Sequence, residues 1–153
     1  MTAALATILP QLQRAQGLAQ IGRIGEAWAL LAPLRQAIDS HGQALRLYAL
    51  VAQSAGHLDM AIDALKRIAG LEGGPPDILG AIADSYGKAG RHAEAYEHWG
   101  ALVAHHPAMV DAHLNRAVAA ASAGLHEAAV EAADAGLKRF PRDARLWRPG
   151  PWR

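Results

Sequence analysis

The sequence has no cysteine and few aromatic residues: four tryptophans, three tyrosines and one phenylalanine among 153 residues. Without cysteine, the chain can form neither a disulfide nor a thiolate ligand or nucleophile. No apolar run approaches the roughly 20 residues that a membrane-spanning helix needs, and residues 1–9 lack the basic start of an export signal. These absences favour a cytoplasmic protein without a membrane segment, in which helices pack through small side chains.

Residue patterns typical of catalysis are also missing. The sequence contains no Gly-x-x-x-x-Gly-Lys phosphate loop and no Gly-x-Ser-x-Gly nucleophile turn. Four of its eight histidines, at positions 98, 105, 106 and 113, lie close in sequence, but none has the four-residue spacing of zinc ligands on one helix. We therefore expect no metal site, no cofactor and no enzymatic activity in this chain.

What the sequence does contain is a repeat of 34 residues. Three series of small residues follow it in phase: Gly22, Gly56, Gly90 and Gly124; Ala27, Ala61, Ala95 and Ala129; and Ala15, Ala49, Ala83 and Ala117. A glycine can take the left-handed conformation that ends a helix, and alanines let two helices approach closely. The repeat therefore predicts an all-α protein of four helix-turn-helix units, residues 8–41, 42–75, 76–109 and 110–143, with eight main helices.

The third unit shows the pattern most clearly. Apolar side chains recur at three- and four-residue steps in its first half, and Pro107 prevents its second helix from continuing. At the start of the second unit, Ser40 and Gln43 have the spacing of a capping box, which predicts a side-chain cap there. Residues 1–7 precede the first unit as a lead-in.

The run Leu79-x2-Ile82-Ala83-x2-Tyr86, followed by Ala95-x3-Trp99 and Pro107, resembles the tetratricopeptide repeat. This resemblance implies a right-handed α-solenoid whose first helices line a concave groove, which holds a peptide or a partner protein in many members. The first two units lack the proline of the pattern, with Asp39 and Gly73 in its place.

The resemblance also implies which side chains line the groove. In the first unit they are Leu9, Leu12, Gln16, Ala19 and Gln20, and the lining of the second unit begins with Gln43. The candidates for partner contact in the later units are Arg46, Gln53, Asp77, Asp84, Lys88, Asp111 and Leu114. Arg46 and Lys88 suit an acidic ligand, whereas the three aspartates suit a basic one. The alternative for each is an ordinary solvated surface position.

Arg116 is an unusual residue for its repeat position, because Tyr48 and Ile82 occupy the equivalent position in the second and third units. A buried arginine needs a partner, so we expect it to reach solvent, to pair with a carboxylate or to contact a ligand.

Residues 142–153 form a basic tail in which a fifth repeat starts near Trp147 and is broken by Pro149 and Pro151. Trp147 and Trp152 could cover the last helix, this end could self-associate, or the array could be the N-terminal module of a longer, transferase-type enzyme. Six basic residues less one acidic residue give positions 138–153 a charge of +5, against +1 for the whole chain. Contact with nucleic acid through this tail is the less favoured interpretation, because short arginine clusters are commonly solvated.

Overall fold

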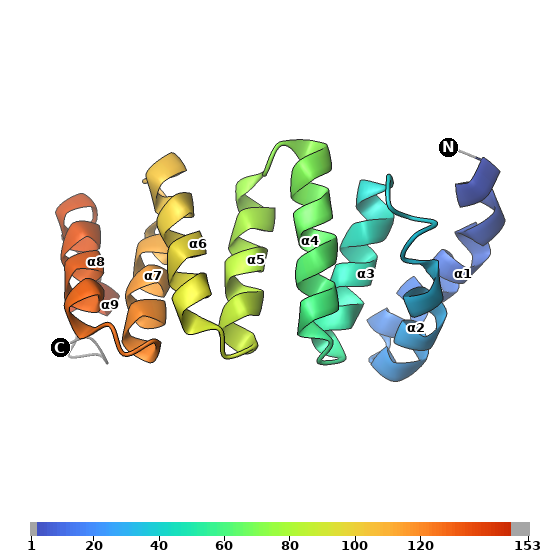
Figure 1. Ribbon diagram of the computed structural model, residues 1–153, viewed down its shortest axis with the longest axis horizontal. Helices are drawn as coiled ribbons and strands as arrows, with labels where there is room; N and C mark the ends of the chain where they lie inside the picture. Colours follow the sequence, from blue (N-terminus) through green and yellow to red (C-terminus); the bar gives the residue numbers. More distant parts are fainter. Residues whose placement is uncertain (1–2, 148–153) are drawn as a thin grey trace. The chain divides into compact units, whose positions relative to one another are not determined.

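A computed structural model describes residues 3–147, and every regular element in that range is a helix. The chain forms two compact units, Met1–Ile78 and Leu79–Arg153. Figure 1 shows the succession of helices along the chain. The expected all-α fold of helix pairs is confirmed over the described residues.

The first unit contains two helix pairs. Helices α1 (Ala3–Gln20) and α2 (Ile24–Leu31) form the first pair, and a short 3-10 helix, η1 (Ala32–Leu34), follows α2 directly. Helices α3 (Gly42–Ser54) and α4 (Leu58–Glu72) form the second pair. Within this unit, α1 packs against α2 and α3 packs against α4, while α1 and α3 touch only sparsely.

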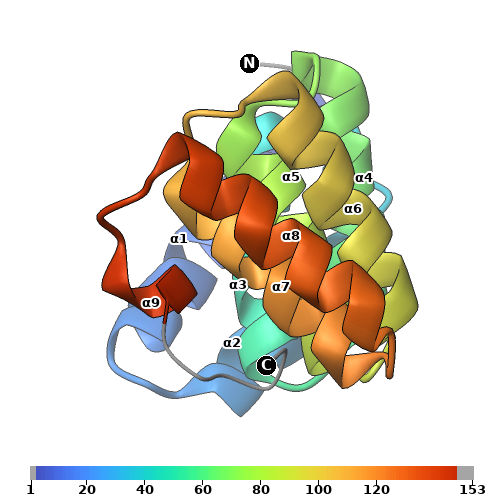
Figure 2. The same ribbon diagram turned by 90° about the vertical axis from the view of Figure 1, so that its left-hand side faces the viewer.

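The second unit continues the same plan. Helix α5 (Pro76–Lys88), which begins at the end of the first unit, is followed by α6 (His92–His105), α7 (Val110–Ser122) and α8 (His126–Arg139). Helix α7 packs against both α6 and α8. A final turn, α9 (Ala144–Trp147), lies against α8, as Figure 2 shows.

Each of the four repeat glycines ends the first helix of its pair. Their φ angles are +81°, +85°, +77° and +79° at Gly22, Gly56, Gly90 and Gly124. After each glycine, the next amide reaches back to a carbonyl five residues earlier, as in the 2.9 Å bond from the Arg23 nitrogen to the Leu18 oxygen. Glycine takes this left-handed conformation without a Cβ clash, so the same turn closes all four first helices.

The alanine series fill the contacts between paired helices. Ala15, Ala83 and Ala117 on first helices and Ala27, Ala61 and Ala129 on second helices are all fully buried. In the second unit, Ala117, Ala120, Ala129, Ala132 and Ala133 form one cluster between α7 and α8. Larger side chains at these sites would force the helices apart.

Helix α1 begins at Ala3, so most of the lead-in, residues 1–7, is helical; its alanines and Leu5 are strong helix formers. One local expectation at the start of the second unit is wrong. The capping box is absent, because His41, not Ser40, is the N-cap residue of α3 and no side chain caps it. The spacing of two residues does not by itself determine which residue leaves the helical conformation first.

Candidate functional site

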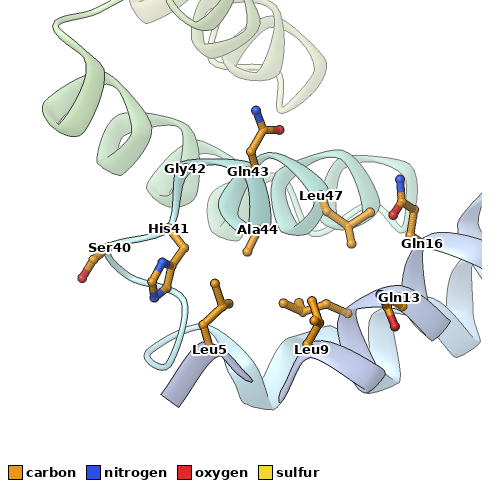
Figure 3. Close-up of a pocket in the computed structure, with 11 residues that line it drawn as sticks. Leu5, Leu9, Gln13, Gln16, Ser40, His41, Gly42, Gln43, Ala44 and Leu47 are labelled. Carbon is orange, nitrogen blue, oxygen red and sulfur yellow. The ribbon is translucent and has the colours of Figure 1, made fainter. Parts of the chain in front are cut away.

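A cavity of about 630 Å³ lies between α1 and α3 in the first unit. Its lining comprises Leu5, Leu9, Leu12, Gln13 and Gln16 of α1, the connecting residues Ser40 and His41, and Gly42, Gln43, Ala44 and Leu47 of α3. We call this cavity the α1–α3 groove. Figure 3 shows Leu5 and Leu9 on one side facing Ala44 and Leu47 on the other. Its volume is within the range of protein ligand sites.

The groove exists because the second helix of the first pair is short. Helix α1 has 18 residues and is about 27 Å long, whereas α2 has eight residues and is about 12 Å long. Pro33 lies in the 3-10 turn after α2 and cannot donate the hydrogen bond that a continuing α-helix requires. The chain therefore crosses from α2 to α3 through turns, and the N-terminal part of α1 lacks a full-length partner helix.

Ion pairs hold the non-helical connection after α2 in place. Arg35 lies 2.8 Å from Asp39 and 3.1 Å from Asp63 of α4, and Arg67 of α4 donates to the Asp39 carbonyl oxygen at 2.9 Å. The hydrogen bond from Arg35 holds the pKa of the Asp39 carboxyl below its ordinary value. Charged side chains thus attach this non-helical connection to α4.

The groove carries almost no charge. None of its eleven lining residues is Asp, Glu, Lys or Arg, and His41 is the one titratable side chain among them. Leucine side chains supply apolar surface, and the exposed amides of Gln13 and Gln16 at one end can both donate and accept hydrogen bonds. Such a lining suits an uncharged segment with apolar side chains and a peptide backbone.

The structure brings several of the predicted partner-contact residues together, but as ion pairs with each other or with neighbours. Both terminal nitrogens of Arg46 are used: Nη2 lies 3.0 Å from each Glu72 carboxylate oxygen, and Nη1 lies 3.5 Å from Asp77. In the second unit, Lys88 pairs with Asp84 at 3.1 Å. The charges expected to attract a ligand are therefore balanced within the chain.

The other three predicted residues are separate from these pairs. Asp111 pairs with Arg145 at 2.9 Å, Gln53 is half-buried near the end of α3, and Leu114 packs against the alanine cluster of α7 and α8. Arg145 also binds Asp143, and its hydrogen bond holds the pKa of the Asp143 carboxyl below its ordinary value. One of the basic residues near the C-terminus is thus already neutralised.

A smaller cavity of about 260 Å³ lies within the second unit. Asp84 and Lys88 line it, together with Gly87, Trp99 and Val118 among others. Two of the predicted residues therefore border a hollow in the structure.

Most of the α1–α3 groove was missed from the sequence. Leu9, Leu12, Gln16 and Gln43 were expected at the groove, whereas Leu5, Gln13, His41 and Leu47 were not. A signal was available in the leucine spacing of α1 and in Pro33, which indicates a shortened second helix.

The unusual internal residues also have defined surroundings. His113 is buried, its Nε2 lies 2.9 Å from the Pro107 carbonyl oxygen, and its ring meets Phe140 edge-on. Among residues 3–147, no three His, Cys, Asp or Glu side chains are grouped closely enough to hold a metal ion. In the same range, no helix has the length and apolar character needed to cross a bilayer.

At the C-terminal end, the structure disfavours one of the three alternatives, in which Trp147 covers the last helix. Trp147 is 59 % exposed and donates its indole hydrogen to the Pro141 carbonyl oxygen at 2.7 Å. Leu146 is fully buried in its place and approaches Gly136 of α8. Trp152, the other residue expected to take part, lies outside the described residues.

Repeated antiparallel helix pairs, closed by the same glycine turn and packed through alanines, define an α-helical repeat protein. The family description that matches is the tetratricopeptide repeat, over residues 81–147. The matched segment lies within the second unit. No curated protein sequence matches it.

Solved structures share the fold at low sequence identity. A MamA protein superposes with a TM-score of 0.72 at 20 % identity, covering 90 % of this chain and 75 % of that one. A MamA from Desulfovibrio magneticus RS-1 gives 0.71 at 16 % identity, with 95 % and 81 % coverage. YrrB, described as a tetratricopeptide repeat protein with an unusual peptide-binding site, gives 0.65 at 15 % identity, with 95 % and 79 % coverage. At these identities the likeness concerns the fold.

Proposed function

We propose that this protein is a non-catalytic interaction module whose α1–α3 groove binds an uncharged, leucine-bearing segment of a partner protein. The observation that carries the proposal is the groove itself, which combines about 630 Å³ of space with facing leucines and no charged side chain. An acidic or basic segment would lose hydration there without gaining an ion pair, which disfavours it. The described peptide-binding site of YrrB supports peptide recognition on this fold.

The charged residues expected from the family resemblance form a second set of candidates. Arg46, Asp77, Asp84, Lys88 and Asp111 could contact a partner only by exchanging an existing ion pair for a new one, because each already has a charged neighbour. Exposed pairs of this kind contribute roughly 0 to 1 kcal/mol, so the exchange has a small driving force. Gln53 and Leu114 would add polar and apolar contacts beside them. We place these residues second to the α1–α3 groove.

The test uses a matched pair of leucines on α3. Leu47 lines the groove, whereas Leu50, one turn along the same helix, is 59 % exposed and does not. Peptides are first selected for binding to the full chain from a random 12-residue display library. The affinities of the chain and of its L47E and L50E variants for the selected peptides are then measured by fluorescence anisotropy.

We expect the selected peptides to be apolar and uncharged. L47E should lower their affinity about tenfold or more, because a carboxylate then occupies the apolar lining. L50E should lower it by less than about twofold. Circular dichroism confirms folding of both variants. Equal losses in the two variants, or selection of strongly charged peptides whose binding depends on Arg46 or Asp84, would contradict the assignment. Analytical ultracentrifugation of the unliganded chain tests whether a second copy of the chain occupies the groove. Self-association that L47E abolishes would mean that it does, and would contradict the assignment to a partner protein.

A further inference from the structure

Three arginines in the described residues are half-buried, and their partners differ. Arg35 contacts the carboxylates of Asp39 and Asp63, and Arg46 contacts those of Glu72 and Asp77. Arg116, on α7, has no carboxylate oxygen within ion-pair distance among residues 3–147. It lies instead beside a phenol and a glycine. A partly desolvated cation without a counter-charge is costly, so the Arg116 environment requires an explanation.

The Arg116 side chain extends from α7 and contacts residues of the neighbouring helix α6 in the same unit. Its Nη2 donates to the Tyr96 hydroxyl oxygen at 3.3 Å, and its guanidinium carbon is 5.1 Å from the centre of the Tyr96 ring. Its Nε is buried and finds no acceptor within the described part of the chain. A Cβ at Gly100 would stand 3.4 Å from that Nε, so glycine leaves the guanidinium room to lie along α6. Tyr96 itself packs against the alanine cluster of α7 and α8.

This arrangement leaves one buried hydrogen-bond donor, the Arg116 Nε–H, without an acceptor among residues 3–147. Arginine has five N–H donors and no acceptor, and only one of them reaches Tyr96. The Tyr96 oxygen accepts that bond, so its own hydrogen remains available to a third group. Both side chains are half-buried and therefore still reachable from outside. Two different donor groups thus lie side by side, one of them cationic, with no carboxylate of residues 3–147 paired to the guanidinium.

We infer that Arg116 and Tyr96 form a binding site for a single carboxylate, such as an Asp or Glu side chain of a partner protein. The planar guanidinium matches a carboxylate in two parallel hydrogen bonds, and the phenol supplies a third donor. One guanidinium balances one negative charge, which favours a monovalent carboxylate over a divalent phosphate. The site involves residues of α6 and α7 only, and is independent of the α1–α3 groove and of the function proposed for it.

Sodium acetate serves as the probe, and the backbone amide of Gly100 as the reporter. The full ¹⁵N-labelled chain is titrated with acetate, and with phosphate and chloride at matched ionic strength, while two-dimensional NMR spectra are recorded. We expect a saturable shift of the Gly100 amide and of the Arg116 Nε–H with acetate. Y96F should weaken acetate binding about twofold to fivefold, since one donor of about 1 kcal/mol is lost. R116M should abolish it.

Arg46 gives the matched control, since its guanidinium already holds two carboxylates and its Nε–H should not saturate. R116M should unfold at the same or a higher denaturant concentration than the parent chain, because an apolar residue replaces a partly buried charge. If R116M fails to fold, Y96F and the parent chain still decide the question. Chloride shifts equal to those of acetate, acetate shifts unaltered in Y96F, or tighter binding of phosphate than of acetate would each overturn the carboxylate site.

Discussion

The first and fourth helix pairs share a glycine turn and buried alanines, yet they enclose very different spaces. In the α7–α8 pair, helices of 13 and 14 residues pack against each other, and five alanines fill the contact. In the α1–α2 pair, an 18-residue helix faces one of eight residues. The unmatched length of α1 becomes a wall of the α1–α3 groove. A binding site can therefore arise where one repeat departs from the regular pattern.

The same comparison shows how charge is distributed. Arg35 and Arg67 form ion pairs with Asp39, and these hold the irregular connection after α2. In the other helix pairs, a regular second helix occupies the corresponding positions. In the second unit, Arg145 joins Asp111 and Asp143 beside α9. Exposed charges thus attach the irregular segments to regular helices, while the groove itself is left uncharged.

The largest expected effect is a difference in stability between substitutions at two alanines, each of which is the third residue of its repeat. Ala112 is fully buried on α7, whereas Ala44, which is also buried but 9 % exposed, borders the α1–α3 groove. A112L should lower the free energy of unfolding by about 1 to 3 kcal/mol through overpacking. A44L should change it by less than about 0.5 kcal/mol, because its side chain extends into open space. Urea denaturation measures both, and equal losses would mean that the groove is closed in solution.

The turns should respond equally in the two regions. Gly22 and Gly124 have φ angles of +81° and +79°, and nothing lies within 4 Å of a Cβ built on either. Gly22→Ala and Gly124→Ala should each cost about 1 to 2 kcal/mol, because alanine disfavours the left-handed conformation. Gly70→Ala in helix α4, where a Cβ also meets nothing, is the control and should stabilise by up to about 1 kcal/mol. Thermal and urea unfolding compare the three variants, and a neutral result at either turn would contradict the shared capping role.

The smallest effect concerns acid. The pKa values of Asp39 and Asp143 are lowered in the folded chain by hydrogen bonds from Arg35 and Arg145. Because the pKa of each carboxyl is lower in the folded chain than its ordinary value of 3.8, the carboxylate stabilises the folded chain when the pH is above 3.8. This stabilisation is lost as the pH falls through the pKa of the folded chain. D39N and D143N should therefore be slightly less stable than the parent chain at pH 7, with the difference vanishing in acid. Amide exchange should rise near residues 35–40 in D39N and near α9 in D143N; a difference that persists at low pH would argue against these pairs.

How much of this was accessible from sequence depends on the range of the interaction. The four glycine turns and the buried alanines follow from local conformation and periodic spacing, so they were predicted residue by residue. The pairing of Arg46 with Glu72 and of Asp111 with Arg145 was not, because residues 26 and 34 positions apart meet only once the helices are packed. For that reason the predicted partner-contact charges were identified without their neutralising neighbours.

By itself, the sequence determined that this protein consists of helix pairs with a 34-residue period, since left-handed glycines and small residues in phase allow few other arrangements. The tertiary structure alone decided where space and charge remain. The α1–α3 groove results from the end of α2 before Pro33, and the Arg116 environment results from the phenol and glycine that α6 places beside it. Both depend on which side chains meet across helices, and no local pattern specifies that.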